Sequence, residues 1–171
     1  MSNKAFLLII FAVLAFSPIL ASGRSEKRED TTAVKKSELK MLEKSEKKWD
    51  RQKITSYKAD IIYMRGTFPP EEIKITVADN TVTDWKTGNT DTASLSESFI
   101  QSLTVKNMFE KMTGSLESDK PSPMVLKAVY DEKLGYIKSL SRVPSGEAAS
   151  QGRAPFDAGY RIEVTSLEIA E

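Results

Sequence analysis

Residues 57–86 read YKADIIYMRGTFPPEEIKITVADNTVTDWK, and this stretch decides the fold. Apolar and polar side chains alternate along residues 57–64 and again along residues 73–77, which is the period of β-strands with one dry face. A turn rich in glycine and proline separates the two runs. Asp79 and Asn80 end the second run, and both residue types tolerate the positive φ of a tight turn. Because tight turns join antiparallel neighbours, we expect hairpins here.

The rest of the chain adds further strands and one strong helix. The chain returns from the second turn in a third strand over residues 81–86, and apolar runs typical of strands recur at 124–130, 136–141 and 160–165. Between the two groups of strands, apolar residues follow a helical period over residues 104–116, with a threonine in the first position as N-cap. Strands that cluster in hairpins, rather than alternate with helices, indicate the α+β class.

A second, thinner helix precedes the strands. Residues 34–54 are rich in lysine and glutamate and lack glycine and proline, and we expect this helix to dock through Leu42 and Trp49. The preceding residues 24–33 are polar and charged with no apolar period, which predicts a flexible linker. We therefore expect a single α+β domain over residues 34–171. Its antiparallel sheet should have about five or six strands in the chain order α-βββ-α-βββ, with one amphipathic helix packed on a face and the N-terminal helix docked at the side.

Residues 1–23 have the pattern of a secretory signal peptide. Lys4 supplies the positive charge, an uncharged and mostly apolar run follows over residues 5–20, and small residues close the segment at Ser22 and Gly23. We expect cleavage after one of these two residues. The product should be exported, periplasmic or extracellular, and soluble without a membrane span. The alternative is an uncleaved leader that anchors the chain, since the apolar run is near the shortest span of about 17 residues.

The composition excludes several classes of chemistry. The 171 residues include no histidine and no cysteine, which excludes histidine-based catalytic triads, thiolate nucleophiles, disulfides and the usual zinc and iron–sulfur sites. The chain has 25 basic and 24 acidic residues, so removing Lys4 with the leader leaves 24 of each. A chain without positive excess is a poor nucleic-acid binder. We therefore expect no nucleic-acid partner, no cofactor and no metal site.

Six residues have side chains and positions that suit a site. The carboxylates of Asp131 and Asp157 could act as general acid and base if about 5–9 Å separates them, as in glycoside hydrolysis. The structural alternative weighs more: Asp131 accepts hydrogen bonds within its own turn, Gly135 supplies a left-handed turn residue, and the tyrosines pack with their hydroxyls at the rim. We expect no catalytic residue. The candidate ligand-binding or partner-binding residues are Tyr130, Asp131, Tyr136, Asp157, Tyr160 and Trp85.

Several short blocks occur together along the chain. They are Trp49, ITSY at 54–57, ITV at 75–77 before Asp79 and Asn80, Phe109, Tyr130-Asp131 with Gly135-Tyr136, and Asp157 with YRIEV at 160–164. In this order they resemble a family of bacterial exported proteins and lipoproteins catalogued as domain of unknown function 6174, over roughly residues 45–170. The resemblance implies export and this architecture, and no activity. The chain departs from the family pattern at Ile137, where members typically carry proline, and in lacking the cysteine through which many are lipidated.

These observations favour an exported, non-enzymatic domain that binds a protein or another component of the cell envelope. The candidate surface is the sheet face that carries Ile62, Met64, Lys74 and Trp85, because a single strong helix covers one face and leaves the other open. Two alternatives stay open. One is a hydrolase that uses the two carboxylates named above, and the other is a carrier of a small apolar ligand in a cavity between the strong helix and the sheet.

Overall fold

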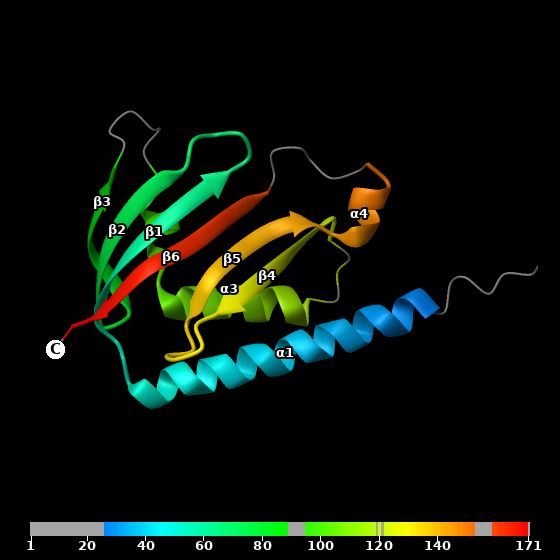
Figure 1. Cartoon of the computed structure of the whole chain (residues 1–171), viewed down its shortest axis with the longest axis horizontal. Helices are drawn as coiled ribbons and strands as arrows, with labels where there is room; N and C mark the ends of the chain where they lie inside the picture. Colours follow the sequence, from blue (N-terminus) through cyan, green and yellow to red (C-terminus); the bar gives the residue numbers. More distant parts are fainter. Residues whose placement is uncertain (1–25, 89–94, 119, 121, 153–158, 171) are drawn as a thin grey trace, which may run out of the picture.

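The computed structural model describes residues 26–88, 95–118, 120, 122–152 and 159–170. Within these residues the helices and strands follow one another in the order given next, and Figure 1 labels all of them except α2. They are α1 (Glu26–Gln52), β1 (Tyr57–Arg65), β2 (Glu71–Ala78), β3 (Thr81–Thr87), α2 (Glu97–Gln101), α3 (Val105–Glu117), β4 (Met124–Tyr130), β5 (Ile137–Pro144), α4 (Gly146–Ser150) and β6 (Tyr160–Ile169). The predicted α+β class is confirmed. The predicted leader lies outside the described residues.

The six strands of the described residues form one antiparallel sheet, in the spatial order β3-β2-β1-β6-β5-β4. The pairs β1-β2, β2-β3 and β4-β5 are neighbours along the chain, as predicted, because short connections join antiparallel strands. The last strand, β6, pairs with both β1 and β5. Figure 1 shows β6 running between these two strands, so the C-terminal strand joins two separate hairpin units into one sheet.

One face of the sheet is covered and the other is open. Buried and more exposed residues alternate along β2, where Ile73, Ile75 and Val77 are buried, which confirms the predicted dry face. The open face carries charged residues that pair across strands: the Lys74 ammonium lies 3.6 Å from the Asp60 carboxylate. Exposed pairs of this kind add little stability. Because the buried residues of the strands all lie on the covered face, the hydrophobic core lies on one side of the sheet, between the strands and the helices.

A bulge in β3 changes the face on which one predicted site residue lies. The register between β2 and β3 shifts by one residue, so that Val82 lies opposite Val77 while Trp85 lies opposite Ile75. Residues directly opposite each other point to the same face of a sheet. Trp85 therefore belongs to the covered face at the sheet edge, where it is 38% exposed. The prediction that Trp85 shares the open face with Ile62, Met64 and Lys74 is wrong. The extra residue of the bulge reverses the alternation of faces along β3.

The predicted amphipathic helix is α3, which lies against the covered face. Thr104 caps its N-terminus as predicted, since the Thr104 hydroxyl accepts a hydrogen bond from the Asn107 N–H at 3.2 Å. The Tyr57 hydroxyl of β1 accepts a second one from the Val105 N–H at 2.8 Å. Both bonds satisfy donors that the first turn of a helix leaves unpaired. The buried stripe of the helix consists of Val105, Met108, Phe109, Met112 and Leu116.

The N-terminal helix, α1, is longer than predicted. It begins at Glu26, inside the stretch 24–33 for which the sequence predicts a linker, and before the expected start at residue 34. The physical reason is propensity: these residues are mostly charged, and they include no glycine or proline to stop a helix. The missing apolar period means that this part of the helix has no stripe to bury, and it does not prevent the helix from forming.

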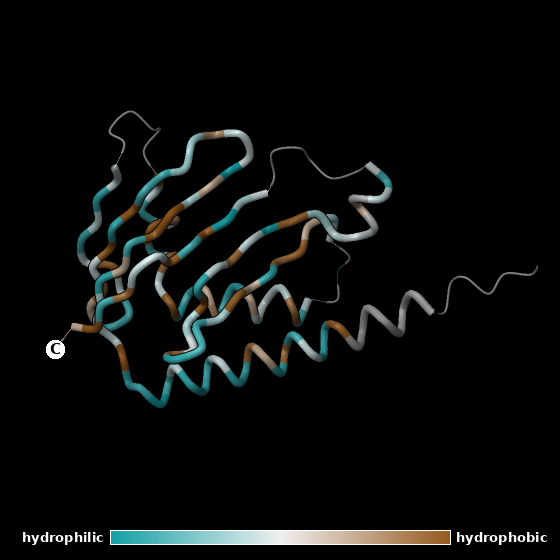
Figure 2. Tube along the Cα trace, in the orientation of Figure 1, coloured by the Kyte–Doolittle hydropathy of each residue, from teal (hydrophilic) through white to brown (hydrophobic). Residues whose placement is uncertain are grey.

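α1 extends the helical layer and packs against α3. Leu42 and Trp49 are buried, as predicted, and the Trp49 ring makes edge contacts with the rings of Tyr57 and Tyr136 at centroid distances of 5.8 and 6.1 Å. Figure 1 shows α1 along the outer border of the molecule, and Figure 2 shows few hydrophobic positions on it. One side of α1 thus meets the core and the rest faces solvent.

The sequence pattern predicts neither of the two short helices, α2 and α4. α2 and α4 have five residues each, which is too short for a hydrophobic period to appear. Gln101, at the end of α2, holds the edge strand β3: its side-chain oxygen accepts from the Val82 N–H at 3.0 Å, and its side-chain nitrogen donates to the Val82 carbonyl at 2.9 Å. A side-chain amide here replaces the strand that β3 lacks, which protects this edge of the sheet.

Candidate functional site

The turn between β4 and β5 holds the first predicted site residue, Asp131. One carboxylate oxygen, Oδ1, accepts hydrogen bonds from the N–H groups of Lys133 and Leu134 at 2.9 and 2.6 Å. The backbone closes the same turn, since the Asp131 N–H donates to the Tyr136 carbonyl at 2.8 Å and the Asp131 carbonyl accepts from the Gly135 N–H at 3.0 Å. The geometry therefore supports the structural role considered for Asp131, in which its carboxylate shapes the turn.

This turn is fitted closely against α1. Gly135 has φ +91°, and a Cβ added there would lie 2.6 Å from the Ser45 carbonyl oxygen and 2.9 Å from the Lys48 Cβ. The Lys48 ammonium donates to the Glu132 carbonyl in the same turn. Glycine is thus required at this position for two reasons, the backbone conformation and the close approach of the helix.

Tyr130 and Tyr136 flank the turn, and their rings pack against the helices. The Tyr130 ring stacks on Phe109 of α3 with centroids 6.5 Å apart and planes at 13°. Burial raises the pKa of Tyr136, and burial together with the nearby carboxylates of Glu38 and Glu46 raises the pKa of Tyr130 to about 12. Both hydroxyls therefore stay protonated at physiological pH, and these tyrosines join the helices to the sheet.

The six predicted residues do not meet at one place in the described part of the chain. Tyr130, Asp131 and Tyr136 gather at the β4–β5 turn. Trp85 lies on β3, the strand at the opposite edge of the sheet from β4. Asp157 lies outside the described residues. Tyr160 opens β6 and belongs to a second group of side chains.

This second group consists of three aromatic side chains from three elements. The Tyr63 ring of β1 lies 4.7 Å from the Phe99 ring of α2 and 6.4 Å from the Tyr160 ring of β6, measured between centroids. Each of the three side chains is partly buried. We call Tyr63, Phe99 and Tyr160 the aromatic cluster. It lies at the end of the covered face where β1 finishes and β6 begins, so it forms a surface with both apolar and polar contact points.

Cations surround the Tyr160 member of the aromatic cluster. The Lys111 ammonium of α3 lies 4.9 Å from the centroid of the Tyr160 ring, within the range of a cation–π interaction. Arg65 of β1 and Arg142 of β5 are the residues directly opposite Tyr160 in the sheet. Cross-strand partners share a face, so both arginines lie on the same face as Tyr160, where the Arg65 guanidinium lies 4.9 Å from the centroid of the Phe68 ring. The three cations thus exceed the one carboxylate that the described residues place beside the cluster, that of the buried Glu71, which lies opposite Tyr63.

The Tyr160 hydroxyl is buried and has no hydrogen-bond partner among the described residues. Leaving a buried hydroxyl unpaired costs about 1–3 kcal/mol. The neighbouring Tyr63 has its pKa raised, chiefly by burial and further by Tyr160 and Glu71, while Arg65 acts in the opposite direction. The Tyr63 hydroxyl therefore stays protonated at neutral pH. The aromatic cluster can offer stacking area, a hydrogen-bonding hydroxyl and nearby positive charge.

Sequence reasoning identified Tyr160 and missed the residues around it. The alternation along its strand places Tyr63 on the dry face, so the face on which this residue lies could be predicted. Phe99 lies in the five-residue helix that showed no period, and Lys111 lies in the exposed half of α3. No pattern in the sequence indicates that β1 pairs with β6, and this pairing is what brings Tyr63 and Tyr160 together.

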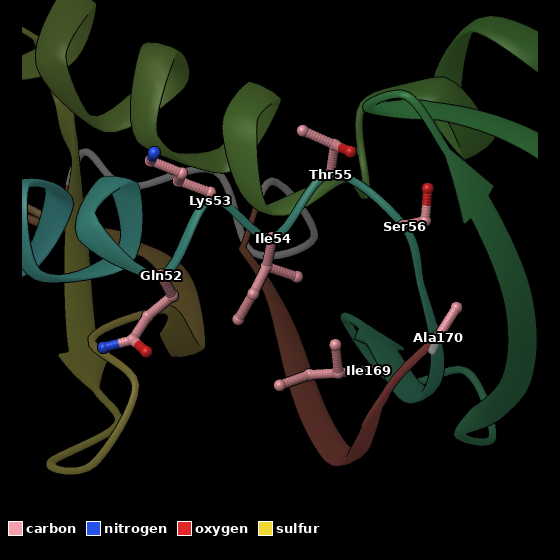
Figure 3. Close-up of a pocket in the computed structure, with 7 residues that line it drawn as sticks. All are labelled: Gln52, Lys53, Ile54, Thr55, Ser56, Ile169 and Ala170. Atoms are coloured by element: carbon pink, nitrogen blue, oxygen red, sulfur yellow. The ribbon is translucent and has the colours of Figure 1, made fainter.

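The pocket in Figure 3 is in a different place. It encloses about 340 Å³ at the corner where the end of α1 leads into β1 beside the end of β6. Most of its lining residues are exposed. The carrier alternative calls for a cavity between α3 and the sheet, where Met108, Phe109 and Met112 are almost fully buried in the core. The pocket in Figure 3, in contrast, is lined by Gln52, Lys53, Ile54, Thr55, Ser56, Ile169 and Ala170.

Within the described part, no three acidic side chains gather where they could hold a metal ion. No helix in the same ranges is both long and apolar enough for a membrane span. What these residues do bring together is the aromatic cluster, with its neighbouring cations and its buried hydroxyl.

Comparison with known proteins gives a family and no closer relative. No curated protein and no solved structure matches the chain. Residues 41–153, more than half of the 171 residues, match a family described as a family of unknown function. This range runs from the middle of α1 to just beyond α4, and therefore includes five of the six strands. The chain belongs to this family, DUF6174.

Proposed function

We propose that the chain is an exported, non-enzymatic domain that binds a partner protein of the cell envelope through the aromatic cluster. The order of positive, apolar and small residues in 1–23 supports export. The hydrogen bonds that engage Asp131 in its turn support a non-enzymatic role, because this carboxylate is one half of the acid–base pair considered. The lack of histidine and cysteine supports the same reading.

One observation carries the proposal, the buried hydroxyl of Tyr160, which has no hydrogen-bond partner in the part of the chain that the structure describes. A buried polar group without a partner lowers the stability of the isolated domain. A ligand reaches this hydroxyl only when the side chains that cover it move aside; it then supplies the missing hydrogen bond, removes this cost and gains the stacking area of the adjacent rings. Binding at the aromatic cluster can therefore gain a hydrogen bond that the free domain lacks. The turn at Asp131 offers no such gain, because its carboxylate already accepts two hydrogen bonds.

The chemistry around the aromatic cluster favours an acidic segment of a protein as the ligand. Tyrosine and arginine are the residue types that most often dominate binding at protein interfaces. Lys111, Arg65 and Arg142 give this end of the sheet a positive charge, which complements a negatively charged partner. The open face of the sheet is less suitable, because its charges already pair with one another, as in Arg161 with Glu163 at 3.0 Å.

The test compares two tyrosine variants of the same chemistry. The chain over residues 24–171 is immobilised and exposed to its native envelope fraction, and bound protein is identified, purified and titrated back. We expect Tyr160→Phe to weaken binding about tenfold, which corresponds to one lost hydrogen bond of about 1–1.5 kcal/mol. The matched control, Tyr136→Phe, should keep the affinity, because Tyr136 packs against α1 at the other end of the sheet.

Stability measurements separate a binding hydroxyl from a structural one. Removing an unpaired buried hydroxyl should leave the free energy of unfolding of Tyr160→Phe unchanged or raise it by up to about 1 kcal/mol. A loss of more than about 1 kcal/mol would show that the hydroxyl has a structural partner after all. Equal affinity of wild type and Tyr160→Phe, or recovery of a sugar in place of a protein, would contradict the proposed function.

A further inference from the structure

One side of α1 carries a row of exposed cations. Their spacing along the chain is four, four, three and four residues, which returns to the same side of a helix at each step. At about 100° per residue they fall within an arc of about 80°, and at 1.5 Å per residue the row is about 22 Å long. We call these residues the basic stripe. They are Lys36, Lys40, Lys44, Lys47 and Arg51.

The other charges of this helix segment are directed elsewhere. The Lys35 ammonium donates to the Ser118 carbonyl at 3.1 Å, and Lys48 donates to the β4–β5 turn, so both lysines are held by the body. Glu38 and Glu46 are partly buried and lie close enough to Tyr130 to affect its ionisation. Two of the four acids in this segment, Glu38 and Glu46, therefore lie toward the body, away from the basic stripe.

Two acids lie beside the basic stripe and neutralise little of it. Glu43 is 3.9 Å from the Lys47 ammonium, and both side chains are well exposed, so the pair is weak. Asp50 is exposed on the same flank. Among the described residues, the other four members of the stripe have no ion-pair partner within 4.0 Å. The positive charge of the basic stripe is thus available to an external anion.

A helix that only needed solubility would place its charges differently. Alternating signs at a spacing of four residues stabilise a solvated helix, whereas like charges at that spacing repel. Lys36, Lys40 and Lys44 are spaced in this unfavourable way, and so are Lys47 and Arg51. The sequence therefore accepts repulsion within the helix, and an anionic surface laid along the stripe relieves it.

We propose that α1 lies with its basic stripe on the surface of a membrane that contains anionic phospholipids. A membrane suits a straight row of cations on the outside of the molecule, and Figure 1 shows α1 along the outer border with the sheet and α3 to one side. The apolar run of residues 5–20 precedes α1 by a few residues, so the chain brings this helix to a bilayer during export. Acidic headgroups attract lysine and arginine in such a position.

This inference goes beyond the proposed function and uses another face of the molecule. The aromatic cluster lies where β1 ends and β6 begins, and Figure 1 shows these strand ends on the side of the molecule away from α1. The domain could therefore hold a membrane with α1 and a protein with the aromatic cluster at the same time. A variant of one surface should leave the other unaffected.

The test is binding of the chain over residues 24–171 to vesicles. It retains all described residues and lacks the apolar run, which would itself bind lipid. Vesicles of phosphatidylcholine with about one third phosphatidylglycerol are compared with pure phosphatidylcholine vesicles, at about 0.1 M and about 0.5 M salt. Each cation near an acidic membrane strengthens binding about fivefold, so the variant K40Q/K44Q/K47Q should bind the anionic vesicles about a hundredfold more weakly.

A matched control loses the same charge from another surface. The variant K86Q/K127Q/K138Q removes three exposed lysines from β3, β4 and β5 and should bind the anionic vesicles like wild type. Tyr160→Phe should also bind them like wild type, which separates this inference from the proposed function. Circular dichroism confirms that each variant is folded.

Three results would overturn the inference. The first is no binding of wild type to the anionic vesicles. The second is equal binding to the neutral vesicles, or binding that salt does not weaken. The third is an equal loss in both lysine variants, which would reflect net charge and not the position of the stripe. Binding to soluble polyphosphate or to an acidic protein without binding to vesicles would likewise assign the stripe to another class of anion.

Discussion

Replacing Gly135 by alanine should destabilise the domain by forcing apart two elements that are distant in sequence. The added Cβ would lie 2.6 Å from the Ser45 carbonyl oxygen and 2.9 Å from the Lys48 Cβ, both on α1. Backbone atoms of a helix cannot move aside like the end of a flexible side chain. The β4–β5 turn and α1 must therefore separate, and the edge contacts of Trp49 with Tyr57 and Tyr136 weaken with them.

The expected magnitude has two parts. A side chain at φ +91° costs about 1–2 kcal/mol, because L residues rarely adopt this conformation. Overpacking against α1 adds about 1–3 kcal/mol. Gly152 separates the two parts: it also has a positive φ, of +62°, but no atom of the described residues lies within 4 Å of the Cβ that alanine would add. Gly152→Ala should therefore cost the conformational part alone.

Urea unfolding followed by tryptophan fluorescence measures both variants. The chain has two tryptophans, so a Trp85→Phe background leaves Trp49 as the only reporter, and Trp49 lies where the damage is expected. We expect Gly135→Ala to lose about 2–5 kcal/mol of unfolding free energy, and about 1–3 kcal/mol more than Gly152→Ala. Equal losses in the two variants would refute the reasoning, because the contact between the turn and α1 would then contribute nothing.

Two further predictions concern the tyrosine core and the sheet edge. Burial raises the pKa of Tyr57 to about 12 from an ordinary value of 10.0. As pH rises the unfolded chain therefore loses this proton first, and Tyr57 should lower the unfolding free energy by about 2–3 kcal/mol between about pH 10 and pH 12. Tyr130, whose pKa is also raised to about 12, adds to this fall, so Tyr57→Phe should make the fall smaller by about 2–3 kcal/mol, and an unchanged profile would contradict the prediction. Gln101→Ala should cost about 1–2 kcal/mol, because the N–H and carbonyl of Val82 lose their partner; urea unfolding tests this, and no loss would show that the amide does not hold the edge.

The strands and their turns could be predicted because their signals are local. The dry face of residues 73–77 follows from a period of two, and the structure buries Ile73, Ile75 and Val77 accordingly. Asp79 and Asn80 have φ of +50° and +63°, as their residue types suggest for a tight turn. In these places propensity, pattern and tertiary packing agree, so a short window of sequence contains all the information that matters.

The arrangement of the strands could not be predicted for the opposite reason. β6 is the last strand in the chain and lies in the middle of the sheet, paired with β1 about a hundred residues earlier. Local patterns specify which face of a strand is dry, and they leave open which strand pairs with it. The error at Trp85 has a related cause, since one extra residue in a bulge reverses the face of every residue beyond it.

The candidate site likewise contains some residues that local sequence predicts and others that depend on long-range strand pairing. Asp131 and Gly135 were predictable as turn residues because their hydrogen bonds and backbone conformation are local. The aromatic cluster was not, because Tyr63, Phe99 and Tyr160 come from three segments that meet only once β6 pairs with β1. The basic stripe is an intermediate case. Its spacing can be read from the sequence, but whether it faces solvent or the core depends on which side of α1 Leu42 and Trp49 dock.

The contact at Gly135 bears on both proposals, because it joins the helix that carries the basic stripe to the body that carries the aromatic cluster. The β4–β5 turn fixes α1 on the body, so weakening that contact loosens the basic stripe relative to the sheet. Attraction between a row of cations and a flat anionic surface does not require a fixed relation to the sheet, so vesicle binding should survive Gly135→Ala wherever the variant is folded. Binding at the aromatic cluster does require β1, α2 and β6 to hold their positions, and the cluster lies at the other end of the sheet from this turn, since Tyr160 pairs with Arg142 near the far end of β5. A substitution that weakens the fold at this turn should therefore lower stability while leaving both binding activities in place, as expected of a structural joint between two surfaces that act separately.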